Sequence, residues 1–352
     1  MYSSIATSQN GSAELADECD ISHVLEGNPH PENSTAFTAI ALLTVIAIAS
    51  CPFTILLNAL VIVAVNTKPR LKTSSNILVG CLAVTDVFMG LFAQPMYIAC
   101  RTLNLHGDTS DEYCTLLRLT RNIIRLLAAS SIHHVFIMSF ERYYAIKNVL
   151  TYTTMRNKTR KLLGSSALAW IAAIAGAVLQ AFSIKVFITF TSILLSVILA
   201  VIIFCQVGVY SETRRHVKCI AAQQVSLEAR KKFSKEKKAL KLTSCVIAFL
   251  LLTFLPLFFV RILLFTSAIT SVNVSNFSFN AITLVTILNS LINPIIYCVR
   301  LRQFRVAFVQ ILLRKNHPQA EQFEMRMVRF VSKNCTVKPE AGHQMENTRN
   351  SQ

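Results

Sequence analysis

The stretch of sequence that decides the fold is residues 114–144, which reads CTLLRLTRNIIRLLAASSIHHVFIMSFERYY. It is mostly apolar and long enough for a helix that crosses a membrane. Its first half nevertheless carries Arg118, Arg121 and Arg125, and its second half stays almost charge-free until the Glu-Arg-Tyr triplet at 141–143. Charges inside an apolar span are costly in lipid, so each calls for a partner or a function. We therefore expect one end of this helix to meet a ligand and the other end to meet a signalling partner.

The composition of the whole chain indicates a protein dissolved in lipid. Of its 352 residues, 53% are hydrophobic and only 15% are charged, whereas an ordinary soluble domain has about 25% charged residues. The net charge of +17 suggests nucleic acid as one partner to consider. The basic residues lie in short clusters between apolar runs, however, which is typical of the cytoplasmic loops of a membrane protein. We therefore predict no nucleic-acid partner.

Runs without charge predict an all-α membrane protein, a bundle of seven transmembrane helices. Each run exceeds the roughly 20 residues that a helix needs to cross a bilayer. Residues 162–211 contain Lys185 as their only charge and are long enough for two helices joined by a very short loop near residues 180–185. The other five predicted spans are 33–67, 73–100, 114–144, 239–266 and 277–299.

The distribution of Lys and Arg predicts how these helices are oriented. Segment 1–35 has six acidic residues and no Lys or Arg, whereas 29 of the 35 basic residues of the chain lie on the other side of the predicted membrane. By the positive-inside rule the N-terminus is extracellular and the C-terminus cytoplasmic, as in a multi-pass protein of the plasma membrane. Four Asn-x-Ser/Thr sequons then lie outside, where they can be glycosylated. They are Asn10, Asn33, Asn273 and Asn276.

The chain beyond the seventh span divides into two parts. In residues 301–314 apolar residues recur every three to four positions between basic ones, which favours a short amphipathic helix on the inner leaflet. Residues 315–352 are polar and are predicted to form a disordered cytoplasmic tail. The N-terminal segment 1–35 and the helical bundle 36–300 complete the predicted organisation. Basic residues near the inner surface also predict contact with anionic membrane lipid.

The order of short motifs in these spans resembles that of the rhodopsin-like G-protein-coupled receptors. The resemblance extends from about residue 58 to residue 308 and rests on six motifs in order on the expected spans. It implies a receptor that activates a heterotrimeric G protein when it binds an extracellular or membrane-borne ligand, and it implies no enzymatic activity. The motifs are Leu57-Asn58-Ala59-Leu60-Val61, Leu82-Ala83-Val84-Thr85-Asp86 followed by Pro95, Glu141-Arg142-Tyr143, Trp170, Phe254-Leu255-Pro256 and Asn293-Pro294-Ile295-Ile296-Tyr297.

The resemblance implies an activation switch at the inner end of the bundle. Arg142 is expected to be held at rest by Glu141 and Glu236 and to be released toward the G protein, an element with two states that a ligand can bias. The plain alternative is an interfacial ion pair whose Arg side chain snorkels to the surface. At the proline of the seventh span the alternative to a hinge is a simple helix kink. The residues expected to complete the switch are Tyr143, Leu150, Tyr210, Asn293, Pro294 and Tyr297.

Asp86 is a lone carboxylate in the second span, and the resemblance implies that it binds a sodium ion. Oxygen-bearing side chains suit such a hard cation. The alternative is a neutral, hydrogen-bonded aspartic acid. We expect no other cofactor. The residues implied for the sodium site are Asp86, Ser131, Asn289 and Ser290, with Asn293 nearby.

The arginines of the opening stretch indicate where the ligand binds. Arg125 lies eleven residues beyond Cys114, roughly 16 Å deeper and near the middle of a hydrocarbon core of roughly 30 Å. A charge there costs about 2.5–3.5 kcal/mol, and the outer halves of the spans contain no acidic residue, so we expect an anionic ligand. Arg118 lies higher and is expected to reach the outer headgroups. The candidate ligand-pocket residues are Arg121, Ile124, Arg125, Phe254 and Arg261.

Departures from the family pattern narrow the ligand. The resemblance places Ile124 where amine receptors carry an Asp and Ile287 where retinal-binding receptors carry a Lys, so we expect neither a monoamine nor retinal. It also implies a disulfide from Cys114, but the predicted second outer loop contains no Cys. Cys19 and Cys100 are alternative partners, and a reduced Cys114 is the third alternative.

Two other function classes stay open. A membrane transporter or channel would have paired broken helices in two related halves, and seven spans without an inverted repeat speak against it. A receptor-like protein that binds a ligand without G-protein signalling is the second alternative, and the presence of both Arg142 and Glu236 speaks against it. Arrestin is a further partner to consider, but the tail has few hydroxyl side chains, so we expect its recruitment through phosphates to be weak. These side chains are Ser332, Thr336, Thr348 and Ser351.

Overall fold

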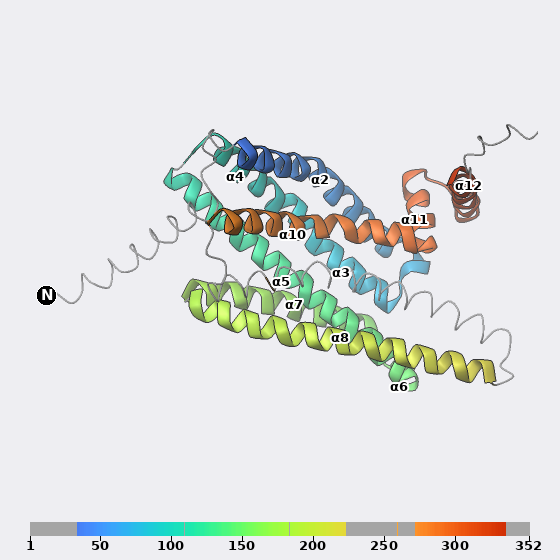
Figure 1. Cartoon of the computed structure of the whole chain (residues 1–352). Helices are drawn as coiled ribbons and strands as arrows, with labels where there is room; N and C mark the ends of the chain where they lie inside the picture. The colour runs from blue at the N-terminus through green and yellow to red at the C-terminus, as the bar shows by residue number, and fades with distance from the viewer. Residues whose placement is uncertain (1–33, 109, 183, 223–258, 260–271, 336–352) are drawn as a thin grey trace, which may run out of the picture.

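The computed structural model of the chain describes residues 34–108, 110–182, 184–222, 259 and 272–335 (Figure 1). In this part of the chain every regular element is a helix and no strand occurs. The helices are α2 (Ser34–Thr67), the 3-10 turn η1 (Pro69–Leu71), α3 (Ser74–Phe88), the π-helical turn η2 (Met89–Ala93), α4 (Gln94–Leu105), α5 (Asp111–Lys147), α6 (Val149–Thr154), α7 (Lys158–Phe182), α8 (Ile184–Ala222), α10 (Val272–Arg300), α11 (Arg302–Leu312) and α12 (His317–Cys335).

Five of the described helical stretches are long and apolar enough to cross a membrane. They are Phe37–Thr67, Ser74–Leu105, Asp111–Lys147, Lys158–Gln180 and Thr189–Arg215. α10 and α11 pass the same test as a bent pair whose axes differ by 99°. The predicted sixth span, 239–266, lies outside the described residues except for residue 259. The prediction of an all-α, multi-pass membrane protein is confirmed, and the very short connection predicted near residues 180–185 is present between α7 and α8.

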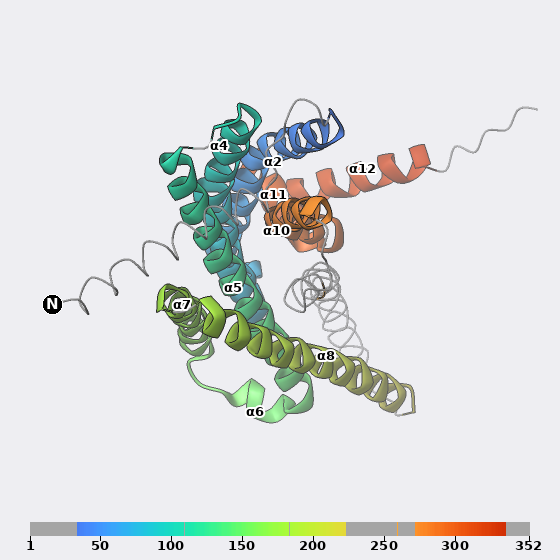
Figure 2. The same ribbon diagram turned by 60° about the vertical axis from the view of Figure 1, so that its left-hand side comes forward.

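The long helix α5 forms the centre of the bundle and contains the whole of the opening stretch. It packs against α3, α4, α7 and α8, and it also contacts α10 (Figures 1 and 2). Its first turn is capped by the Ser110 hydroxyl, which accepts a hydrogen bond from Tyr113 N at 3.2 Å. Asp111 and Glu112 in the same turn oppose the positive end of the helix dipole. We call the end of the bundle near Ser110 the Cys114 end and the opposite end, where α5 meets α6, the Arg142 end.

A π-helical turn interrupts the second span, which the sequence predicts as continuous. The turn η2 immediately precedes α4, where Pro95 lies in the first turn. Because proline lacks an N–H and clashes with the preceding turn, the chain widens locally to absorb it. Gly90 in this turn lies against α2, since a Cβ at this position would come within 2.7 Å of Ile55 Cγ1. The Cys51 thiol donates to the Gly90 carbonyl at 3.4 Å, so the turn is bonded to α2.

The tail of the chain is more ordered than the sequence predicts. Residues 315–352 were expected to be disordered, but α12 occupies 317–335 and packs on α11, which is turned across the Arg142 end. Ala320 and Glu324 lie one turn apart on α12 and are both buried. Figure 2 shows α12 reaching away from the bundle beyond α11. For residues 317–335 the prediction is wrong, because composition reports low hydrophobicity, whereas the order there comes from contacts with another element. Residues 336–352 lie outside the described residues.

Gly208 allows α8 to lie close to α5. A Cβ at this position would come within 2.5 Å of Cε2 and 2.8 Å of Cδ2 of the Tyr143 ring. That ring is packed edge-on against Phe204, with centroids 5.6 Å apart. The contact therefore requires glycine at residue 208.

We predict that Gly208→Ala destabilises the protein by about 1–3 kcal/mol, the usual cost of overpacking. Gly164→Ala is the matched control, because a Cβ at Gly164 meets nothing within 4 Å. Both substitutions add the same methyl group and raise helix propensity equally. Thermal unfolding of the two purified variants measures the difference. Equal unfolding temperatures would show that the Tyr143 ring moves aside without cost.

Candidate functional site

The Glu-Arg-Tyr triplet lies at the Arg142 end of α5, where a salt bridge holds Arg142. Its Nε lies 3.3 Å from Glu141 Oε2, and the exposed fractions of the two side chains are 14% and 6%. A charge pair this far removed from water is screened much less than an exposed one. The predicted resting contact of Arg142 with Glu141 is therefore present. Its second predicted partner, Glu236, lies outside the described residues.

Tyr152 of α6 completes this cluster and is missing from the sequence-based prediction. Its hydroxyl donates a hydrogen bond to Glu141 Oε1. Burial, together with the negative charge of Glu141, raises the pKa of Tyr152 to about 12, so the hydroxyl keeps its proton at neutral pH. Glu141 therefore has Arg142 on one oxygen and a phenol on the other. Only the fold of α6 back against α5 brings Tyr152 to this position.

The other switch residues at this end fall into two environments. Leu150 is 82% exposed on α6, as a contact residue for a partner requires. Tyr210 on α8 is also exposed, and Arg214 Cζ lies 5.4 Å from its ring centroid. Tyr297 is buried instead, with its ring 5.7 Å from that of Phe304. The described conformation therefore does not bring Tyr210 and Tyr297 together.

Asp86 is the centre of a buried polar network between α3 and α10. Asn293 Nδ2 donates to Asp86 Oδ2 at 2.8 Å, and Ser290 also hydrogen-bonds to this carboxylate. Asn58 extends the network to α2, because its Nδ2 donates at 2.9 Å to the carbonyl of Ser290 and at 2.9 Å to that of Thr54. Three helices are thus joined by side chains that the sequence places more than 200 residues apart.

Several oxygen atoms of this network lack a hydrogen-bond partner among the described residues. Asp86 Oδ1, Asn289 Oδ1 and Asn293 Oδ1 are all buried and have no such partner. Leaving a buried acceptor unsatisfied costs about 1–3 kcal/mol. Ser131 of α5 and Ser290 of α10, the other predicted ligands, are also buried. A set of neutral and anionic oxygens fits a hard cation such as sodium.

Transition-metal chemistry has no comparable donor set in the described part of the chain. No group of three or more His, Cys, Asp and Glu side chains is close enough there to hold a metal ion. The two adjacent histidines of α5 bond within the bundle: His133 Nδ1 lies 2.6 Å from the Ala129 carbonyl and His134 Nδ1 lies 2.8 Å from the Ser130 carbonyl. His134 Nε2 also lies 2.7 Å from Ser166 Oγ of α7, so this residue joins two helices.

Three of the five predicted ligand-pocket residues lie in the half of α5 toward the Cys114 end. Ile124 is buried in an apolar cluster with Tyr97 and Ile287, whereas Arg121 and Arg125 are partly buried. Arg125 Nη1 donates to Asn122 Oδ1 at 3.4 Å, and the same oxygen accepts from Gln180 Nε2 of α7 at 2.8 Å. Two further members of the predicted pocket, Phe254 and Arg261, lie outside the described residues.

Arg101 adds a cation at this end that the sequence-based prediction does not include. It belongs to α4 and is only 2% exposed. Its Cζ lies 5.4 Å from the centroid of the Tyr97 ring, a cation–π geometry. Arg101 directly follows the second predicted span, but the sequence pattern does not show that its side chain is buried against Tyr97.

The cysteines decide two of the three predicted alternatives. Cys114 forms a disulfide, so the alternative of a reduced Cys114 is wrong. Cys100 keeps its thiol, and its Sγ lies 3.3 Å from Thr120 Oγ1. The alternative Cys114–Cys100 disulfide is therefore wrong, and Cys19 stays the predicted partner outside the described residues. The sequon side chains Asn10, Asn33, Asn273 and Asn276 also lie outside the described side chains.

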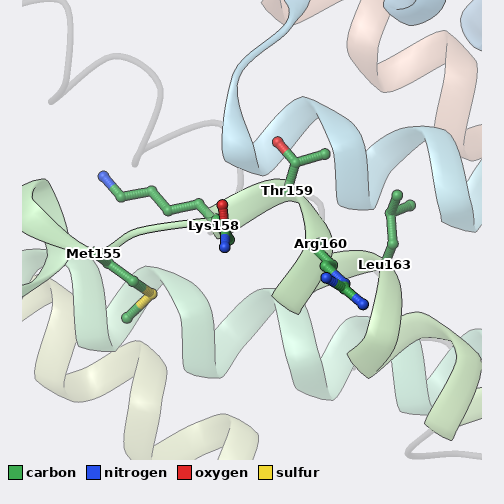
Figure 3. A pocket seen from close by; sticks show the side chains of 6 residues that line it. Met155, Lys158, Thr159, Arg160 and Leu163 are labelled. Carbon is green, nitrogen blue, oxygen red and sulfur yellow. The ribbon is translucent and has the colours of Figure 1, made fainter.

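A surface hollow of about 660 Å³ lies where α6 is followed by α7 (Figure 3). It contains none of the predicted ligand, sodium or switch residues. Lys158 on its rim is already engaged, because its Nζ lies 4.5 Å from the Tyr152 ring centroid and 3.3 Å from the Thr153 carbonyl. The lining residues are Met155, Asn157, Lys158, Thr159, Arg160 and Leu163.

Comparison with known proteins supports the arrangement of motifs. Residues 57–187 and 181–297 match the family described as 7 transmembrane receptor (rhodopsin family). The histamine H4 receptor of Homo sapiens is 29% identical over 116 residues, 33% of this chain and 28% of that protein. The histamine H1 receptor of Cavia porcellus is 30% identical over 158 residues, 44% of this chain and 31% of that protein. The adenosine receptor A2b of Canis lupus familiaris is 32% identical over 133 residues, 38% of each.

The matched part of the chain spans about a third of the length of these relatives. The family match itself covers more than half of the chain. On the described helices, Asn58, Asp86 and Asn293 of three separate motifs bond through one buried network. The chain therefore belongs to the rhodopsin family of seven-transmembrane receptors, which are receptors and not enzymes.

Proposed function

We propose that this receptor converts binding of a ligand at the Cys114 end into activation of a heterotrimeric G protein at the Arg142 end. The observation that carries the proposal is the salt bridge of Arg142 with Glu141, whose second oxygen is bonded by Tyr152. The N-terminus is then extracellular, the tail is cytoplasmic and the membrane is the plasma membrane. The distribution of basic residues supports this orientation.

The cluster around Glu141 supports a two-state mechanism. In the resting state Glu141 compensates the charge of Arg142, and Tyr152 keeps Glu141 in position. In the active state Arg142 turns toward the G protein, and the exposed Leu150 of α6 enters an apolar site on the same partner. A ligand shifts this equilibrium only by the difference between its affinities for the two states.

The ligand that we propose is small, anionic and either extracellular or membrane-borne. Arg101, Arg121 and Arg125 concentrate positive charge at the Cys114 end of α4 and α5. Ile124 is an apolar, buried residue of the same region, so α5 offers no carboxylate at this position for a cationic amine. The names of two similar receptors refer to histamine, and the arginines distinguish this chain's proposed ligand from such a cation.

We predict that Arg142→Ala reduces basal and ligand-stimulated G-protein activation by about tenfold or more, equivalent to about 1.4 kcal/mol. Arg156→Ala is the control, because Arg156 is an exposed arginine between α6 and α7. A cell assay with a panel of acidic lipids and small molecules measures both. Unchanged signalling in Arg142→Ala would contradict the mechanism. Ligand binding without signalling by the unaltered protein would favour a binding protein, and ligand flux would favour a transporter or channel.

We also propose that Asp86, Ser131, Asn289 and Ser290 bind a sodium ion. A ligand present at ten times its dissociation constant stabilises a protein by about 1.4 kcal/mol, which raises the unfolding temperature by a few degrees. Replacing choline chloride with sodium chloride at constant ionic strength should therefore raise the unfolding temperature of the unaltered protein. Asp86→Asn should abolish this difference. An equal sodium effect in both proteins would rule out the site.

For the ligand site, we predict that Arg125→Ala abolishes the response to an anionic agonist found in the panel. Arg118→Ala is the matched control, because Arg118 lies about two helical turns nearer the Cys114 end. There its Nη2 lies 3.4 Å from Thr115 Oγ1. It should leave the maximal response intact. Surface expression of both variants must equal that of the unaltered receptor. A full response of Arg125→Ala to the same agonist would exclude Arg125 from the site.

A further inference from the structure

The tail helix α12 is attached to α11 by a buried carboxylate. Glu324 is 4% exposed. Its Oε2 lies 3.0 Å from Arg302 Nε, and its Oε1 lies 2.9 Å from Arg305 Nε and 2.8 Å from Arg305 Nη2. Two guanidinium groups thus contact one carboxylate, Arg302 at one oxygen and Arg305 through two nitrogens at the other, and such charge-assisted hydrogen bonds are stronger than neutral ones.

This attachment differs in kind from an ordinary surface ion pair. Arg302 is half exposed and Arg305 is less exposed, but Glu324 is almost fully buried between them and the adjoining helix. An isolated buried carboxylate is very unfavourable, so Glu324 is compatible with this position only while the arginines surround it. Docking of α12 is therefore linked to the positions of Arg302 and Arg305.

Arg305 also binds the end of α10. Its Nη1 donates to the carbonyl of Cys298 at 3.1 Å and to that of Val299 at 2.9 Å. These carbonyls belong to the last turn of α10, where a cation is favoured by the helix dipole. One arginine of α11 consequently holds α12 with one side of its guanidinium group and α10 with the other.

The last turn of α10 is the turn that contains Tyr297. Leu301 N donates to the Tyr297 carbonyl at 2.9 Å, and the Tyr297 ring lies 5.7 Å from that of Phe304. Phe304 and Phe308 are buried, which places this face of α11 in the core of the Arg142 end. Any displacement of Tyr297 must therefore disturb the contacts of α11.

A second, weaker contact joins α12 to η1, between α2 and α3. Arg70 of η1 has its Nη1 2.6 Å from His317 Nε2 and 3.9 Å from Glu321 Oε1. Arg70 is 68% exposed and Glu321 39% exposed, and exposed ion pairs contribute little to stability. The helix α12 therefore contacts η1 through His317 and Glu321 and contacts α11 through Glu324.

From these contacts we propose that α12 is an intramolecular latch that keeps the receptor in its resting state. Glu324 holds Arg305, Arg305 holds the end of α10, and α11 keeps Tyr297 against Phe304. Undocking of α12 removes the first of these contacts and lowers the free energy needed to move Tyr297. The signalling consequence rests on the proposed G-protein function, whereas the coupling of α12 to α10 does not.

Hydrogen exchange on the full-length receptor in lipid nanodiscs tests the coupling directly. Glu324→Gln keeps the shape of the side chain and removes its charge. We expect the backbone amides of α12 and those of residues 297–301 to exchange at least about tenfold faster. Glu321→Gln is the matched variant, because it makes the same change one turn earlier at an exposed ion pair, and it should change exchange by less than about twofold. Faster exchange in α12 alone, or no change at all, would overturn the proposal.

Basal G-protein activation provides the second measurement. Glu324→Gln should raise it about fivefold or more, the lower range of coupling between two sites. Arg302→Gln, which removes the more exposed of the two cations, should act in the same direction and replaces Glu324→Gln if that variant does not fold. Faster exchange at 297–301 with unchanged basal activation, in a receptor whose unaltered form signals, would overturn the latch. Absence of signalling in the unaltered receptor would count against the proposed function and leave the coupling established.

Discussion

The structure depends on one constraint, which is that polar groups inside an apolar bundle must find their partners on neighbouring helices. Asp86 is bonded by Asn293, and Asn58 bonds the backbone of the seventh predicted span beside it. His134 reaches Ser166 of α7 in the same way. These contacts fix how α2, α3, α5, α7 and α10 are aligned along one another, because apolar packing by itself has little directional preference.

Charge follows the same constraint at the Arg142 end. Among the described residues of this end, the carboxylates of Glu141 and Glu324 are buried, and each is compensated by nearby donor groups. Glu141 is bonded by Arg142 and by Tyr152 of α6, and Glu324 by two arginines of α11. Both sites are stable only while their partners stay in place, which makes them natural positions for a conformational switch. Glu141 is bonded by Tyr152 of α6, the helix that carries the proposed contact residue Leu150. Glu324 is linked through Arg305 to the last turn of α10, which contains Tyr297.

Much of the fold was predictable because hydropathy and charge act locally. The charge-free runs predicted most ends of the described long helices to within about five residues, although α8 continues to Ala222, eleven residues beyond the predicted run. The bend into α11 follows the change from an apolar run to an amphipathic one. Contacts over long distances were not predictable in the same way. The bond from Tyr152 to Glu141, the buried position of Arg101, the thiol state of Cys100 and the docking of Glu324 each depend on a neighbour that the local pattern does not reveal.

The sequence by itself determined that this is a multi-pass helical membrane protein, because the length and apolarity of its spans leave no other way to satisfy the backbone in lipid. It also determined the family, through motifs at fixed positions in those spans. Only the tertiary structure decided which side chains those motifs contact and that the tail forms a helix on α11. The physical reason is that burial and pairing of charge are properties of the assembled bundle, since a carboxylate such as Glu324 is stable in the interior only when another helix supplies its cations.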